Sequence, residues 1–172
     1  LHCKATPVIC EINPDSWCIE PGEVEKLINS KTKAIIPVHL YGQPCDMDRL
    51  VDLALRYNLF LVEDCAEALG SEWKGKVVGT FGDAAIFSFF GNKTISTGEG
   101  GMILFRDPEV GRKSKIMRDH GMSPSKRYWH EVIGYNYRLT NIQAAIGVAQ
   151  METFETILDH KLRIADIYKK YL

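Results

Sequence analysis

Residues 84–90, AAIFSFF, form an apolar run that is interrupted only by Ser88. A continuous apolar segment of this length is typical of a strand with both sheet faces covered, as in the parallel sheets of α/β proteins. The run is far shorter than the roughly 20 apolar residues that a membrane helix needs. It therefore predicts a buried strand of a largely parallel sheet.

Other short apolar runs alternate with helical patterns along the chain. Strands are also expected at residues 6–12, 33–40, 59–62 and 102–105. Helices are expected at residues 21–30, 47–57 (with Asp46 as cap and Asn58 as stop) and 108–117. Thr140 and Gln143 have the spacing of a capping box, which begins a last helix that continues or kinks into residues 158–171. This order predicts an α/β domain whose mostly parallel central sheet is flanked by helices.

Composition and charge exclude several classes of function. The 172 residues are 45% hydrophobic and 25% charged, as in a soluble globular domain. The net charge, 21 − 22 = −1, gives no basic field for binding nucleic acid or a membrane surface. The five cysteines form no C-x-x-C pair and the histidines show no zinc spacing, so we expect reduced thiols, no metal site and a cytoplasmic location. No basic and apolar leader opens the chain, so no secretion is expected, and a chain that begins with Leu1 rather than Met is expected to be trimmed or partial.

Polar residues that follow the predicted strands mark the candidate site, because ligands of parallel sheets bind beyond the carboxyl ends of the strands. These residues are His39, Asp64 and Lys93, which lies in the loop 91–101. A lysine near strand ends can lose part of the stabilisation of its charge, and a neutral lysine forms Schiff bases with aldehydes, pyridoxal phosphate foremost. That cofactor needs an acid opposite its ring nitrogen, a role that suits Asp64, and the Ser88 hydroxyl could serve its phosphate.

Each of these residues also has an ordinary structural interpretation. Most loop lysines are solvated, an aspartate at a strand end often caps a turn, and a serine in an apolar strand is commonly a satisfied core hydroxyl. The glycines at 98–101 match neither the dinucleotide-binding fingerprint nor the phosphate-binding loop. The residue patterns alone therefore predict an α/β domain with a candidate lysine site.

Three blocks of sequence within residues 34–152 resemble one known family, and the resemblance runs over roughly residues 6–171. They are AIIPVHLYGQPCDMDRL, LVEDCAEALGSEWKGKVVGTFGDAAIFSFFGNKTISTGEGGMI and HEVIGYNYRLTNIQAAIGVAQME. They are similar to the sugar-nucleotide aminotransferases of the DegT–StrS family, fold-type I pyridoxal phosphate enzymes that aminate a keto-sugar attached to a nucleotide. Within the family, FSFFGNKTISTGEGG and VIGYNYRLTNIQAAIG most resemble the GDP-perosamine synthases.

The resemblance implies a role for each candidate residue in the pyridoxal phosphate site. Lys93 would bind the cofactor covalently and move the proton, Asp64 would pair with the ring nitrogen, and Ser88 would hold the phosphate. A lysine rather than a histidine at position 93 favours amino transfer over deoxygenation.

Three further residues receive roles from the same resemblance. Asn136 would reach the cofactor phosphate of a neighbouring subunit, which implies a homodimer or a dimer of dimers with shared active sites. His39 would lie near the cofactor. Glu67, where many members have glutamine, would lie beside the ring and its phenolic oxygen.

The resemblance also implies a reaction and a domain. The protein would convert GDP-4-keto-6-deoxymannose to GDP-perosamine with glutamate as amino donor, for lipopolysaccharide O-antigen synthesis. Residues 1–172 would be the central part of a large cofactor-binding domain, with 139–172 leading towards a small C-terminal domain. The alternatives are a folded or dimerising module without catalysis, a pyridoxal phosphate enzyme for another keto-sugar nucleotide, and one that acts on amino acids.

Overall fold

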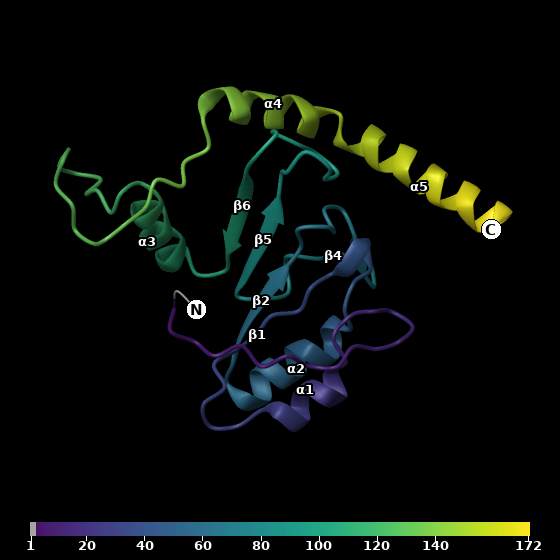
Figure 1. Ribbon diagram of the computed structural model, residues 1–172. Helices are drawn as coiled ribbons and strands as arrows, with labels where there is room; N and C mark the ends of the chain where they lie inside the picture. The colour runs from purple at the N-terminus through teal and green to yellow at the C-terminus, as the bar shows by residue number, and fades with distance from the viewer. Residues whose placement is uncertain (1–2) are drawn as a thin grey trace. The chain divides into compact units, whose positions relative to one another are not determined.

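The computed structural model describes residues 3–172, which form two compact units, one ending at Phe87 and the other beginning at Ser88 (Figure 1). The first unit contains α1 (Pro21–Leu27), β1 (Ala34–Ile35), the 3-10 turn η1 (Leu40–Gly42), α2 (Met47–Tyr57), β2 (Phe60–Asp64), β3 (Glu72–Trp73), β4 (Lys76–Val77) and most of β5 (Ala84–Ser88). The second unit contains β6 (Gly101–Phe105), α3 (Pro108–Arg118), α4 (Asn141–Glu152) and α5 (Phe154–Tyr171).

Strands β1, β2 and β5 of the first unit run parallel in that order. Helix α2 packs on β1 and β2, and α1 packs on α2 (Figure 1). Together with the structural relatives described below, this arrangement confirms the predicted class, a mostly parallel sheet flanked by helices.

The main core of the first unit lies between α2 and the sheet. Its buried side chains include Val24, Ile35, Cys45, Met47, Leu50, Leu53 and Leu61. Side chains alternate along β2, so Leu61 and Glu63 point to the same, buried face. Asp64 lies on the opposite face with Phe60, which is 66% exposed. The fold thus presents Asp64 at the carboxyl end of a strand, on its less covered side.

Local capping signals give helix boundaries close to those predicted. The Asp46 side chain accepts a hydrogen bond from the Arg49 N–H at 3.2 Å, and Asn58 ends α2 in the left-handed conformation with φ 53°. The Thr140–Gln143 capping box begins α4 as expected. Helix α1 ends earlier than predicted, because Ile28 is already extended.

The predicted strand at residues 6–12 is wrong, since only Ile12 forms a β-bridge there, to Ile19. Pro7 has no N–H to donate, and the side chains of Val8 and Ile9 are 65% and 88% exposed. The predicted strand at 33–40 is reduced to β1 and an isolated bridge, with Pro37 in between. Apolar β-rich runs thus became strands only where a neighbouring strand was available.

One further feature was not predicted, and another decides between the two alternatives left open for the last helix. The hairpin β3–β4 was not predicted; its two-residue turn places Lys74 and Gly75 at φ 50° and 80°, as a type I′ turn requires. The last helix is two helices, because Thr153 separates α4 from α5 and its hydroxyl bonds back to the Gln150 carbonyl. Among residues 3–172, no helix is long and apolar enough to span a bilayer.

Candidate active site

Asp64 is half-buried at the carboxyl end of β2, and the chain fixes it on both sides. Its backbone N–H donates to the Pro37 carbonyl at 2.8 Å, and its carbonyl accepts the His39 N–H at 3.0 Å. The Asp64 carboxylate accepts the Ala66 N–H at 3.0 Å, which closes a tight turn after the strand. The position of this acid is therefore defined by backbone bonds in two directions.

Glu67 follows Asp64 after one turn of the chain and is hydrogen-bonded to the segment that follows β1. Its Oε2 accepts the Tyr41 N–H at 2.9 Å, and Tyr41 has the left-handed φ of 52°. The Ser71 hydroxyl donates to the Gly42 carbonyl at 2.7 Å. The structure thus brings three predicted residues of the first unit together: His39, Asp64 and Glu67 form what we call the Asp64 corner.

The His39 side chain is fully buried, and both ring nitrogens have partners within the protein. Nδ1 accepts the Cys45 N–H at 3.1 Å, so the proton of the neutral ring is assigned to Nε2. Nε2 lies 3.3 Å from Oε2 of Glu63. The geometry favours a supporting role for this ring; its predicted place near the cofactor stays a prediction.

Glu63 also belongs to the Asp64 corner, through its hydrogen bond to His39, and the sequence analysis missed it. Its fully buried carboxylate accepts backbone N–H groups from Gly79, Phe81 and Gly82 at 2.6, 2.8 and 2.7 Å. Burial raises the pKa of Glu63, but the hydrogen bonds from His39 and these three N–H groups outweigh it and hold the pKa below its usual value. One signal in the sequence pointed to Glu63: side chains alternate along a strand, which places this acid on the same apolar face as Leu61.

Two predicted residues of the second unit, Ser88 and Lys93, lie in one segment, residues 88–101, which we call the lysine loop. The Ser88 hydroxyl accepts the Phe90 N–H at 3.3 Å, and the Lys93 N–H donates to the Phe90 carbonyl at 3.0 Å. Phe89 bonds across the base of the loop through both its N–H and its C=O, each at 2.9 Å. Lys93 is half-buried in this closed turn.

Helix α4 holds the lysine loop with two glutamine side chains. Gln150 accepts the Ser96 N–H at 3.0 Å and donates to the Ser96 carbonyl. Gln143 donates to the Glu99 carbonyl at 3.0 Å. Sequence reasoning missed both contacts, because helical spacing does not tell what a helix packs against.

Asn136 is exposed and lies on another segment of the second unit. It forms an antiparallel bridge with Asp119. The rings of its two chain neighbours, Tyr135 and Tyr137, stack with centroids 5.1 Å apart. Its predicted contact with a neighbouring subunit stays a prediction.

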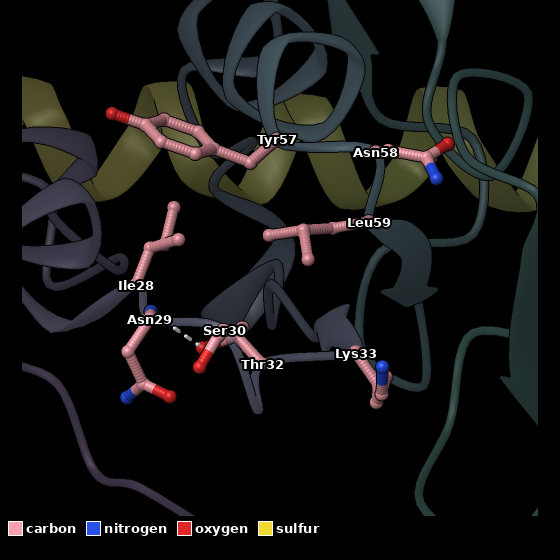
Figure 2. Close-up of a pocket in the computed structure, with 8 residues that line it drawn as sticks. All are labelled: Ile28, Asn29, Ser30, Thr32, Lys33, Tyr57, Asn58 and Leu59. Carbon is pink, nitrogen blue, oxygen red and sulfur yellow. Dashed lines mark hydrogen bonds between the residues drawn. The ribbon is translucent and has the colours of Figure 1, made fainter.

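A pocket of about 440 Å³ in the first unit lies away from the predicted residues. Figure 2 shows its lining, which comes from the chain after α1 and the chain joining α2 to β2. Lys33 and Leu59 in this lining directly precede β1 and β2, so the pocket lies at the amino ends of these strands. Ligands of parallel sheets bind at the carboxyl ends, where Asp64 lies. The pocket is therefore not the candidate site.

The chemistry of the predicted residues fits pyridoxal phosphate. The cofactor presents an aldehyde, a basic ring nitrogen and a phosphate. Lys93 offers an amine, Asp64 a carboxylate and Ser88 a hydroxyl, and the last two lie at strand ends. Among residues 3–172, each group that the cofactor needs thus has a donor or acceptor of the right type.

Comparison with known proteins assigns the family. Residues 1–172 match the DegT/DnrJ/EryC1/StrS aminotransferase family. The chain is 53% identical over 169 residues to a GDP-perosamine synthase of Escherichia coli O157:H7, covering 98% of this chain and 46% of that protein. It is 48% identical over 171 residues to a GDP-perosamine synthase of Caulobacter vibrioides, covering 99% and 46%.

A solved structure supports the same assignment. The putative sugar aminotransferase Spr1654 of Streptococcus pneumoniae, in its PLP form, is 32% identical with a TM-score of 0.88, over 98% of this chain and 48% of that one. The chain thus spans less than half the length of the relatives it matches. It belongs to the DegT/DnrJ/EryC1/StrS family of aminotransferases, whose members depend on pyridoxal phosphate, as the sequence blocks predicted.

Proposed function

We propose that the full-length protein containing this chain transfers the amino group of glutamate to C4 of GDP-4-keto-6-deoxymannose, giving GDP-perosamine and 2-oxoglutarate. The observation that carries this proposal is the 53% identity, over nearly the whole chain, to a protein named for that product. The match extends over 98% of this chain, so it spans the segments that contain the Asp64 corner and the lysine loop.

Lys93 is the catalytic base and acid of the proposal. When bound, pyridoxal phosphate supplies an aldehyde for amines to attack and a protonated ring that withdraws electrons from the carbon bearing the amine. The Lys93 amine would hold the cofactor and, once displaced, would move the proton from Cα of glutamate to the former aldehyde carbon. In the second half of the cycle the same Nζ would move a proton from that carbon to C4 of the sugar.

Asp64 keeps the proton on the ring nitrogen, because a carboxylate opposite that nitrogen favours its charged form. Glu67 would lie beside the phenolic oxygen of the ring, and its bond to the Tyr41 N–H fixes its direction. Ser88 donates its hydroxyl to the cofactor phosphate.

The proposal includes a second subunit. Asn136 reaches the cofactor phosphate of the neighbouring subunit, and its exposed side chain supports a contact outside its own unit. The protein is then a homodimer or a dimer of dimers, and it acts in the cytoplasm, where nucleotide sugars for O-antigen are made.

The test uses the full-length protein, pyridoxal phosphate and ¹⁵N-glutamate with GDP-, UDP- and dTDP-linked 4-keto-6-deoxy sugars. We expect ¹⁵N in the GDP-sugar product, no product with Lys93→Arg, and normal product with Lys74→Arg, a change at an exposed lysine. Preferred labelling of a UDP- or dTDP-sugar would overturn the choice of substrate. A folded protein that transfers no nitrogen to any of them would favour the non-catalytic module.

A further inference from the structure

We propose that Glu63 and His39 form a positioning clamp that fixes the direction of the Asp64 carboxylate towards the ring nitrogen of the cofactor. The proposal rests on the proposed function, because it takes Asp64 as the partner of that nitrogen. Neither Glu63 nor His39 touches the cofactor in this account, so both act through Asp64.

The four hydrogen bonds to Glu63 use both carboxylate oxygens. Oε1 accepts from Phe81 and Gly82, and Oε2 accepts from Gly79 and from His39. The ring of His39 is neutral by its hydrogen bonds, so the clamp keeps a net negative charge in the core. A buried charge is costly, and apolar residues of similar volume often serve stability as well. Such an arrangement therefore suggests a task beyond stability.

The loop that donates to Glu63 is built for close approach. A Cβ at Gly79, which has φ +87°, would lie 2.5 Å from the ring of Phe87. A Cβ at Gly82 would lie 2.5 Å from the carbonyl oxygen of Leu61. Only glycine lets the backbone come this close, so the N–H groups can reach the carboxylate without strain.

The clamp reaches Asp64 through the backbone. Glu63 directly precedes Asp64 and points to the opposite face of β2. His39 donates its backbone N–H to the Asp64 carbonyl while its ring bonds to Glu63. Two residues further on, Tyr41 donates to Glu67. A displacement of Glu63 and His39 therefore moves Asp64, and it also moves Tyr41, whose N–H supports Glu67.

The same side chains could suggest a metal site, because ligand atoms of His39, Glu63 and Cys65 lie within 4.8 Å of one another. Two observations favour the clamp. The carboxylate oxygens already accept four N–H groups. Burial, followed by the charges of Glu63 and Asp64, raises the pKa of the Cys65 thiol to about 12, whereas metals bind the thiolate.

The test is a double-mutant cycle in the full-length protein, with Glu63→Gln and Asp64→Asn alone and combined. Glutamine presents an NH₂ group to backbone N–H donors, so it breaks the clamp with little change in volume. Glu72→Gln on the exposed strand β3 is the matched control. The readouts are pyridoxal phosphate affinity, the absorbance spectrum of the bound cofactor against pH, metal content, and hydrogen exchange of the amides at 79–82 and of Cys45.

We expect Glu63→Gln to weaken cofactor binding about tenfold and to shift the spectral pH transition, whereas Glu72→Gln changes neither. In the Asp64→Asn background the same change should have no effect on affinity or spectrum, because the clamp acts through Asp64. Hydrogen exchange should become faster at the clamped amides in both backgrounds. His39→Gln, which keeps a side-chain donor, should give a smaller shift in the same direction.

Three results would overturn the clamp. The first is faster hydrogen exchange with unchanged affinity and spectrum, which would show that Glu63 only holds the loop. The second is an equal loss in the Asp64→Asn background. The third is a stoichiometric metal that Glu63→Gln removes. If Glu63→Gln does not fold, the same criteria apply to His39→Gln. Failure of the wild-type protein to bind the cofactor would instead refute the proposed function.

Discussion

The Asp64 corner and the lysine loop are held in place by different chemistry. In the corner, one buried carboxylate gathers four N–H donors from segments far apart in the sequence. In the loop, the neutral amides of Gln143 and Gln150, both from α4, bond to backbone groups. Hydrogen bonds to a charge contribute about 1.5–3 kcal/mol each, against about 1 kcal/mol for neutral ones.

This difference matches the tasks proposed for the two regions. In the proposed reaction Asp64 keeps one partner, the ring nitrogen, so a rigid setting costs nothing in turnover. Lys93 must exchange its partner for substrate and take up and release protons, which a more weakly held loop permits. A residue that keeps one partner is thus supported by hydrogen bonds to a buried charge. A residue that exchanges its partner lies on a loop held by neutral hydrogen bonds.

The largest effect is expected at Lys93, the residue that exchanges its partner in the proposed reaction. Lys93→Ala should lower turnover by about 10³-fold or more, because it removes the general base and acid, while the midpoint of thermal unfolding of the cofactor-free protein stays unchanged. Steady-state assays of amino transfer and a thermal melt measure the two quantities, with Lys74→Ala as control. Transamination at the wild-type rate would remove Lys93 from the mechanism.

The next largest effect is expected in the Asp64 corner, the more rigidly held of the two regions. Glu63→Gln should lower the free energy of unfolding by about 2–3 kcal/mol, because buried N–H donors lose a charged acceptor. The exposed Glu72→Gln should change it by less than about 0.5 kcal/mol. Urea titrations of both variants test this, and equal stabilities would show that the buried charge does not hold the corner.

The stability that the Asp64 corner provides should depend on pH through the Glu63 carboxyl. The pKa of Glu63 is lower in the folded than in the unfolded state, so its contribution is complete above the unfolded value of about 4.3 and is lost as the pH falls through the folded value. Wild type should therefore lose more stability than Glu63→Gln when urea titrations are repeated from pH 6 down to acid. His39 and Cys65 face this carboxyl and remain in both proteins. Parallel curves would contradict the lowered pKa.

The smallest effect is expected at the lysine loop. Gln150→Glu keeps the acceptor for the Ser96 N–H but loses the donor to its carbonyl, so stability should fall by about 1 kcal/mol or less. Hydrogen exchange of the loop amides should become faster, whereas the amides at 79–82 should not change. A loss as large as that of Glu63→Gln would remove the distinction between the two regions.

The sequence predicted those parts of the fold that neighbouring residues determine. Asp46 and Asn58 bound α2, and Thr140 begins α4, because caps act within one turn. The strand at 6–12 was wrong because a strand also needs a partner, which local sequence does not provide. The hairpin β3–β4 carried a readable signal, Lys74-Gly75, which was overlooked.

The candidate site divides in the same way. Asp64 and Lys93 could be found from their places after apolar strands and from the family resemblance. Alternation along β2 marks Glu63 only as an acid on the buried face; its partners could not be predicted, because its donors come from residues 79–82, sixteen or more positions along the chain. The buried state of His39 depends on the same long-range contacts. Supporting residues thus stayed hidden where the contacts that define them span distant segments.

We propose that the lysine loop carries the amine that binds the cofactor. The most direct test incubates the full-length protein with pyridoxal phosphate, reduces it with borohydride and locates the pyridoxyl group by peptide mass spectrometry. We predict one label, on Lys93, that glutamate prevents when added before reduction. Labels scattered over exposed lysines, or a single label on another lysine, would contradict the account.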